Sequence, residues 1–163
     1  STLVAKIAES RGWRSMNGGD VFREEARSRG LSVEQLSSEA KEDTDVDRHL
    51  DELLQKRMSS PESPEIVESR LSGWWAHKNA LECLRVWVSV SEEERARRIQ
   101  KREGGEFSDC LQRSQQRQED DMDRYSSLYG IDLDDMSPYH LVIDADSKDE
   151  SEVFNEVDAI LDR

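Results

Sequence analysis

Apolar positions along the 163 residues alternate between the spacing of a helix and the spacing of a strand. A repeat every three to four residues predicts a helix, and a short β-branched run predicts a strand. The pattern predicts helices from about residue 3 to Gly12, over 20–30, after Ser32, and over 46–58, 91–102, 107–128 and 150–161. It predicts strands over 13–16, 65–68, 84–90 and 140–146. Because the two kinds of element alternate, we expect an α/β fold with a doubly wound parallel sheet.

Local signals predict where several of these elements begin. The Asn-Gly-Gly sequence at 17–19 predicts a turn, after which Asp20 is placed to cap a helix. Ser91, followed three residues later by Glu94, predicts a capping box at another helix start. The run LRVWVSV at 84–90 is largely apolar, which predicts a strand in a sheet covered on both faces.

Composition narrows the classes of function. Apolar residues make up 34% of the chain, charged residues 37%, and the net charge is −14. An acidic chain is poorly suited to long nucleic acids, whose affinity depends on neutralising phosphates. No apolar run reaches the length of a membrane span, and no signal peptide is expected. The two cysteines are far apart and form no metal-binding pattern, so we expect a reduced, cytoplasmic protein. The length of 163 residues suits one domain.

Arginine dominates the basic residues, with 17 of the 23 being arginine and six being lysine. The arginine guanidinium grips phosphate and carboxylate through two parallel hydrogen bonds, whereas lysine acts as a point charge. Local arginine clusters can therefore hold a small anion on an acidic protein. A salt-rich host would favour the same composition, and both explanations stay open.

The predicted helix over 107–128 carries the most informative pattern. Positions 107, 110, 114, 117, 121, 124 and 128 share one face, which is apolar at both ends and charged at Arg117, Asp121 and Arg124. If this face points inward, these charges must pair with each other and with a ligand, because unpaired buried charge is costly. The alternative is a surface ion network, which is common and contributes little.

Three further stretches are candidates for a site, each with a plainer alternative. In NGGDVFRE, Arg23 lies one turn into a helix whose start can hold an anion, or the turn is only structural. In VESRLSGWW, Arg70 leaves the end of a strand, where α/β proteins bind ligands, and the paired tryptophans either stack on a base or pack the core. In RARRIQKREGG, basic residues precede a Gly-Gly hinge. They either belong to a mobile lid or are the basic residues that commonly stabilise the C-terminal end of a helix.

These stretches occur in order together with DTDVDRHLDE and RQEDDMDRYSSLYGIDLDDMSPYHLVID. In that order the chain resembles the cytidylate kinase family of P-loop nucleoside monophosphate kinases, most closely its archaeal-type members. The resemblance implies one three-layer P-loop kinase domain over 1–163, with monophosphate-binding helices at about 20–60 and a short lid at about 95–117. It implies a monomer that transfers the γ-phosphoryl group of ATP, with Mg²⁺, to CMP or dCMP.

The resemblance also implies roles for individual residues. Those that bind CMP would be Asp20, Arg23, Asp47, Arg48, Arg70, Gly73, Arg117, Asp121 and Arg124. The catalytic residues would be Arg98, Arg102 and Arg117, and Asp146 to Lys148 would lie near the adenine. Ser1 and Thr2 would bind ATP, with Ser1 as the Mg²⁺ ligand. No general base is needed, because the acceptor phosphate is already largely ionised and catalysis rests on alignment and charge.

One element of the family pattern does not occur in the 163 residues. They contain no G-x-x-x-x-G-K-[ST] motif, and Ser1 matches its last position. We therefore expect a first strand, a glycine-rich loop and a lysine upstream of Ser1. The alternatives are an inactive P-loop-like module that binds a nucleotide or a partner, and a kinase for another small acceptor such as AMP, UMP or shikimate.

Overall fold

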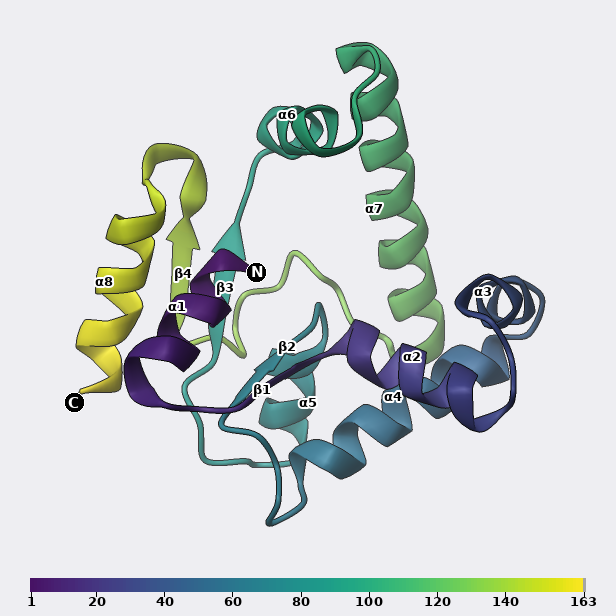
Figure 1. Cartoon of the computed structure of the whole chain (residues 1–163), viewed down its shortest axis with the longest axis horizontal. Coiled ribbons are helices and arrows are strands. Elements are labelled where there is room, and N and C mark those ends of the chain that lie inside the picture. Colours follow the sequence, from purple (N-terminus) through teal and green to yellow (C-terminus); the bar gives the residue numbers. More distant parts are fainter. Residues whose placement is uncertain (163) are drawn as a thin grey trace. The chain divides into compact units, whose positions relative to one another are not determined.

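The computed structural model describes residues 1–162, which form two compact units divided between Cys83 and Leu84 (Figure 1). Both units contain helices and one small parallel sheet of two strands. The protein is therefore α/β, as the alternation of elements predicted, and it is mostly helical, with two small sheets. No described helix combines the length and the apolar character that a membrane crossing demands.

The first unit pairs its two strands beside a group of helices. Its elements are α1 (Thr2–Arg11), β1 (Ser15–Asn17), α2 (Gly18–Ser28), α3 (Val33–Glu42), α4 (Thr44–Met58), β2 (Ile66–Glu68) and α5 (Ser72–Lys78). β1 and β2 are parallel, with Met16 opposite Val67 and Asn17 opposite Glu68. Both strands therefore end at the same edge, which is where ligand sites form in α/β sheets.

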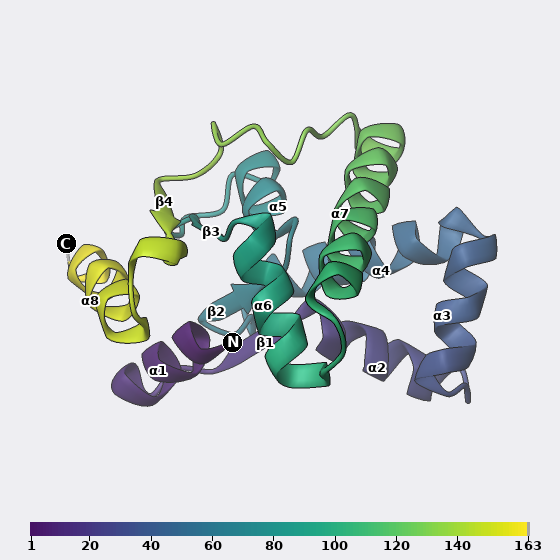
Figure 2. The same ribbon diagram turned by 90° about the horizontal axis from the view of Figure 1, so that it is seen from above.

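An apolar core joins α2, α3 and α4, which follow one another as a helical group (Figure 2). Ala26, Leu36 and Val46, one from each helix, are buried at its centre. Four half-buried side chains pack around them: Phe22, Leu31, Ala40 and Leu50. The spacing of these apolar residues gives each helix one inward stripe and leaves its charged residues outside.

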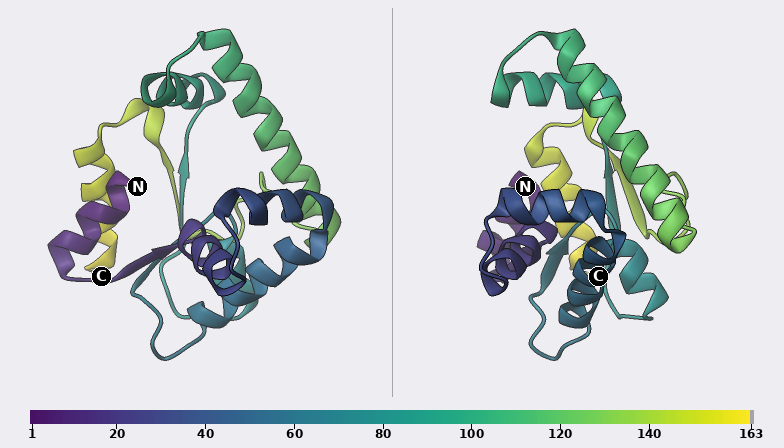
Figure 3. Two further views of the ribbon diagram at one scale, coloured as in Figure 1. Left: turned by 45° about the vertical axis from the view of Figure 1, so that its right-hand side comes forward. Right: turned by 90° about the vertical axis from the view of Figure 1, so that its right-hand side faces the viewer.

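The second unit contains the other parallel pair and a helical hairpin. Its elements are β3 (Val86–Ser89), α6 (Glu92–Glu103), α7 (Phe107–Tyr129), β4 (Leu141–Asp144), a 3-10 turn (Ala145–Ser147) and α8 (Glu150–Leu161). β3 and β4 pair from Val86–Leu141 to Ser89–Asp144. α6 and α7 pack against each other and are joined at one end by Gly104 and Gly105 (Figure 3).

The start of α2 differs from the prediction. The first strand begins at Ser15 rather than Trp13, and the helix begins at Gly18, so Asn17 and not Asp20 is the N-cap. The prediction that Asp20 caps this helix is wrong. Asn17 keeps an extended backbone as it leaves the strand, so its side chain can turn back onto the helix start.

The second sheet is shorter and more exposed than the apolar run at 84–90 predicted. In each of these strands only four residues are paired with the other strand. The predicted strands are longer because apolar sequence alone does not show where hydrogen bonding to a partner strand begins and ends. Val88 is 37% exposed and Val142 is 45% exposed, and they point to opposite faces because Val142 lies opposite Trp87. Among the described residues, neither face of this sheet is fully covered.

Candidate active site

Asn17 and Asp20 hold the start of α2 through a reciprocal pair of hydrogen bonds. The backbone N–H of Asp20 donates to Asn17 Oδ1 at 2.8 Å, and the backbone N–H of Asn17 donates to Asp20 Oδ2 at 2.9 Å. Arg23 Nη2 donates to the other carboxylate oxygen of Asp20 at 2.5 Å. The N–H of Asn17, followed by Arg23, lowers the pKa of Asp20 from its ordinary value. Asp20 therefore acts here as a support for Arg23.

Gly19 lets Arg23 fold back over the helix start. A Cβ at Gly19 would lie 3.0 Å from Arg23 Nη1 and 3.1 Å from Asn17 Oδ1. Any larger residue would push one of these groups away. The Gly-Gly turn therefore allows a close approach between a guanidinium and the first turn of a helix, where backbone N–H groups already favour an anion.

Arg70 and Gly73 lie just after β2, beside the start of α2. A Cβ on Gly18 would lie 3.6 Å from the Cβ of Ser69, so the two strand ends are in contact. The Ser69 N–H donates to Ser72 Oγ at 3.2 Å, and the Ser72 hydroxyl donates to the Ser69 carbonyl at 3.1 Å, which closes the turn carrying Arg70. The structure thus places the predicted phosphate-binding arginines at one sheet edge.

Ser1 lies at the same edge of the first sheet. Its nitrogen is 3.4 Å from Glu68 Oε2 at the end of β2, and its Oγ accepts the N–H of Val4 at 3.4 Å as the N-cap of α1. Thr2 begins the helix and is exposed. The oxygen of a capping serine keeps a second lone pair, so this arrangement leaves Ser1 able to contact a further ligand.

Asp47 and Arg48 lie in the first turns of α4. Val46, directly before them, is buried in the core shared with α2 and α3, and this fixes the rotation of α4. Asp47 is half-buried and Arg48 is exposed. α4 is tied to α2 at its other end by an ion pair between Arg57 and Glu24. The part that Asp47 and Arg48 play in binding stays a prediction.

The charged face of α7 divides into two groups. Arg124 Nη2 donates to Asp121 Oδ1 at 3.0 Å, and its guanidinium lies 4.9 Å from the centre of the buried Tyr125 ring. Arg117 is exposed and lines a small pocket that does not include Asp121 or Arg124. The three charges therefore do not form one inward group: Arg117 is exposed, whereas Asp121 and Arg124 form a partly buried pair, with side chains 13% and 36% exposed. Their part in binding stays a prediction.

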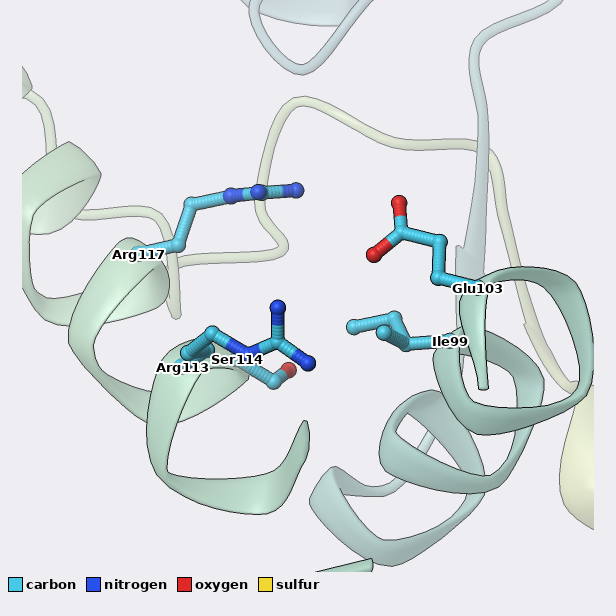
Figure 4. A pocket seen from close by; sticks show the side chains of 5 residues that line it. All are labelled: Ile99, Glu103, Arg113, Ser114 and Arg117. Atoms are coloured by element: carbon cyan, nitrogen blue, oxygen red, sulfur yellow. The ribbon is translucent and has the colours of Figure 1, made fainter. Parts of the chain in front are cut away.

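Arg117 faces α6 across a small open pocket (Figure 4). Arg113 and Arg117 from α7 point toward Ile99 and Glu103 from α6, and Ser114 lies at its floor. Glu103 Oε1 is also 3.9 Å from Arg102 Nε. Sequence reasoning placed Ser114 on this face of α7 but missed Arg113 and Glu103. Arg113 stands one helical turn before Arg117, so the helical spacing could have revealed it.

Glu94 pairs with two arginines on the exposed side of α6. Arg98 Nε lies 3.2 Å from Glu94 Oε1, and Arg97 Nη1 lies 3.2 Å from Glu94 Oε2. Each is a pair within one helical turn, of the kind that contributes little stability at a surface. The pair does hold the Arg98 side chain along the helix, on the same element as Arg102.

The Gly104–Gly105 turn is tied down on several sides. Gln100 Nε2 donates to the carbonyl of Gly105 at 3.0 Å, and the buried Cys110 thiol donates to the carbonyl of Gly104 at 3.6 Å. Both glycines have positive φ, 78° and 94°, which favours glycine at these positions. The predicted hinge is therefore held by side-chain hydrogen bonds.

Two more hydrogen bonds link α6 to α7 along their length. Gln115 Nε2 donates to Glu92 Oε2 at 3.0 Å, and Arg95 Nη1 donates to Gln118 Oε1 at 2.9 Å. With the contacts at the Gly-Gly turn, they fix the spacing between Arg98 and Arg102 on one helix and Arg117 on the other. The arrangement presents several guanidinium groups from one helical hairpin, which is suited to an anion with several negative oxygens.

The model of the cytidylate kinase-like family matches residues 22–147, which include every predicted site residue from Arg23 to Arg124. The chain belongs to the cytidylate kinase-like family. This family membership confirms the resemblance drawn from the ordered stretches of sequence.

Curated relatives of the family cover most of the chain. A cytidylate kinase of Archaeoglobus fulgidus is 41% identical over 150 residues, which are 91% of this chain and 81% of that protein. One of Methanopyrus kandleri is 32% identical over 99% of this chain and 86% of that protein. One of Haloarcula marismortui is 34% identical over 88% of this chain and 73% of that protein.

A solved structure of an uncharacterized protein from Eubacterium ventriosum resembles the fold. Its TM-score is 0.66 at 11% sequence identity, covering 96% of this chain and 90% of that one. At this identity the likeness concerns the fold alone.

Proposed function

We propose that this protein is a cytidylate kinase, which transfers the γ-phosphoryl group of ATP to CMP or dCMP and releases CDP or dCDP. The observation that carries the proposal is the similarity to curated cytidylate kinases, 41% and 32% identical over 91% and 99% of the chain. Small nucleotides are then its substrates. The clustering of arginines at the strand ends and along the α6–α7 hairpin supports the same reaction.

In this proposal, Arg23 and Arg70 bind the phosphate of the acceptor nucleotide. Both follow strands that end at one sheet edge, and Asp20 holds Arg23 in place without occupying all of its donors. Asp47, Arg48 and Gly73 complete the acceptor site of the first unit. Gly73 contributes a backbone that a nucleotide can approach closely.

Arginines of α6 and α7 are proposed to act on the transferred phosphoryl group. Arg117, Asp121 and Arg124 contact the acceptor nucleotide, and Arg98, Arg102 and Arg117 neutralise charge on the phosphates. A guanidinium held by hydrogen bonds to its own protein is already oriented, so it can stabilise the charge that develops in transfer. The acceptor phosphate is ionised near neutral pH, so a catalytic base is unnecessary.

Mg²⁺ is proposed to enter with ATP. The described residues contain no group of three or more histidine, cysteine, aspartate or glutamate side chains suited to holding a metal. Magnesium keeps several waters and binds through substrate phosphates and few protein ligands, which fits that finding. Ser1 Oγ, which accepts only the Val4 N–H in the hydrogen bonds above, is the proposed protein ligand, and Thr2 is proposed beside ATP. When bound, Mg²⁺ cancels charge on the phosphates.

Further parts of the proposal concern architecture and location. We propose one kinase domain over 1–163 whose strands belong to a three-layer, doubly wound sheet of the P-loop type. Residues of about 20–60 form its monophosphate-binding helices and those of about 95–117 its short lid. We also propose a cytoplasmic monomer, and the net charge of −14 disfavours the binding of long nucleic acids.

An ATP-coupled assay on the full-length gene product tests the proposal. CMP, dCMP, UMP, AMP and shikimate are compared as acceptors, and CMP or dCMP is expected to give the highest kcat/KM. A clear preference for another acceptor would refute the substrate assignment. Binding of nucleotide with no transfer to any acceptor would instead identify an inactive binding module.

A further inference from the structure

Asp146 and Ser91 connect the two strand ends of the second sheet. The backbone N–H of Ser91, just after β3, donates to Asp146 Oδ1 at 3.1 Å. The two residues are 55 positions apart in the chain. They meet because Ser89 and Asp144 are paired in register, so the segments that follow both strands leave the sheet at the same edge.

The carboxylate of Asp146 is itself held in a defined place. The backbone N–H of Asp146 donates to Asp144 Oδ1 at 3.0 Å, and Asp144 is the N-cap of the 3-10 turn. Ala145, inside that turn, is buried. The Ser91 hydroxyl and N–H, together with Arg98 and Arg97, lower the pKa of Asp146, so it is ionised at neutral pH. A fixed negative charge therefore stands at the N-terminus of α6, where the helix dipole favours it.

This contact changes what Glu94 can do. In a capping box, the third residue of the helix accepts the N–H of the capping residue. Ser91 Oγ does accept the Glu94 N–H at 3.1 Å, but the Ser91 N–H is taken by Asp146, so the second half of the predicted box is wrong. The Glu94 carboxylate turns outward instead and pairs with Arg98 at 3.2 Å and with Arg97 at 3.2 Å.

We propose that Asp146 is a positioning residue for Arg98. By occupying the Ser91 N–H, Asp146 fixes the start of α6 and leaves Glu94 to orient the Arg98 guanidinium. Removal of Asp146 lets Glu94 return to the Ser91 N–H and release Arg98. The inference rests on the proposed function, in which Arg98 contacts the phosphates of ATP.

A double-mutant cycle between Asp146→Ala and Arg98→Ala tests this link. Asp146→Ala is expected to lower kcat about tenfold, because misplacing a catalytic group by about 1 Å can cost up to about 100-fold. In the Arg98→Ala background the same change is expected to alter kcat less than about twofold, since there is no longer a guanidinium to misplace. Asp146→Asn keeps an oxygen that accepts the Ser91 N–H, and it is expected to recover most of the activity.

Asp149→Ala is the matched control. Asp149 lies three residues after Asp146 and caps α8, since its Oδ1 accepts the Glu152 N–H at 2.8 Å. Asp149 has no part in the proposed site. This variant is expected to lower the melting temperature about as much as Asp146→Ala while kcat stays unchanged. The NMR signal of the Arg98 Nε–H gives a second readout, expected to shift and broaden in Asp146→Ala and to stay in place in Asp149→Ala.

Several outcomes would overturn the inference. Equal losses of kcat from Asp146→Ala with and without Arg98 would show that Asp146 acts independently. A rise in KM for ATP alone, equal in both backgrounds, would indicate a direct contact with the nucleotide. If the unsubstituted protein transfers phosphate to no acceptor, the proposed function fails, and an unchanged Arg98 Nε–H signal in Asp146→Ala would separately refute the positioning role.

Discussion

Asp121 Oδ1 lies 3.0 Å from Arg124 Nη2, and the two residues are one helical turn apart on α7. This ion pair gives Arg124 surroundings different from those of Arg117, although both arginines lie on the same face of the helix. Arg124 has a partner within the protein and rests on the Tyr125 ring. Arg117 is exposed and lines the pocket toward α6. Two arginines that share a predicted role in CMP binding are therefore held in different ways, and their substitutions have different expected effects.

Arg117→Ala is expected to impair turnover and to leave the fold intact. Loss of one charge-stabilising contact in the transition state costs about 100-fold or more in kcat. The melting temperature is expected to change by only about 1–2 °C, as for an exposed side chain away from caps and core. Steady-state kinetics and calorimetry on the same sample measure both. Gln112→Ala, at an exposed position of the same helix, is expected to change neither quantity.

Arg124→Ala is expected to lose a similar factor in kcat and, in addition, about 1 kcal/mol of stability. The added cost comes from the half-exposed ion pair with Asp121 and the cation–π contact with Tyr125. Urea unfolding measures it, and Arg124→Lys, which keeps the charge, is the control. A variant that unfolds more easily yet turns over normally would mark the pair as a surface ion network.

Acid is expected to destabilise the protein partly through Asp20. Its pKa is lowered from the ordinary 3.8 by the Asn17 N–H and Arg23, so its stabilising effect is present above about pH 4 and is lost as pH falls through the folded-state pKa. Asp20→Asn is expected to show a shallower fall in melting temperature than wild type between about pH 5 and pH 3. Parallel curves for the two proteins would contradict this assignment.

Alkali is expected to act through Tyr139. Burial raises the pKa of Tyr139 from 10.0 to about 12, so the stability it contributes is complete below about pH 10 and is lost as pH rises toward 12. Tyr139→Phe retains the ring, whose centre lies 5.4 Å from that of Trp87, and removes the titrating hydroxyl. Melting temperatures measured from about pH 8 to pH 11.5 are expected to fall less steeply in Tyr139→Phe.

Salt is expected to stabilise the protein. With a net charge of −14, the folded chain repels itself, and added ions screen that repulsion. The melting temperature is expected to rise as KCl increases from about 0.05 M to about 1 M. Repeating the titration with sucrose separates screening from preferential exclusion, since sucrose carries no charge. A melting temperature that does not change with KCl would show that repulsion among the charges contributes little to the stability of the fold.

The helices could be predicted because their apolar spacing is a property of the local sequence. The buried positions of Ala26, Leu36 and Val46 follow directly from that spacing. The partners of the capping residues were harder to predict, because they depend on which groups the folded chain brings within hydrogen-bonding distance. Nothing near Ser91 in the chain reveals that a carboxylate 55 residues away takes its N–H. The error at Asp20 was smaller, since Asn17 and Asp20 share one turn and differ only in which of them begins it.

The site was predictable where one helix carries it. The spacing of Arg117, Asp121 and Arg124 placed them on one face of α7, yet it could not show that Arg117 turns toward Glu103. That outcome depends on how α6 packs on α7, which follows from contacts such as the one between Arg95 and Gln118. Spacing within one element is readable from sequence, whereas the choice of partner between elements is not.

In the proposed site, the hydrogen bonds that join α6 to α7 bear on how tightly the arginines of the hairpin bind phosphate. Flexible arginines lose conformational entropy when a ligand orders them, and that loss weakens binding. Because the Gly104–Gly105 turn, Gln115 and Gln118 already hold the two helices together, the entropy cost of fixing α6 beside α7 falls on folding and not on ligand binding. In the proposed site the two helices are therefore preorganised before the nucleotide binds, and a variant with a looser hairpin is expected to bind phosphate more weakly while it keeps every guanidinium.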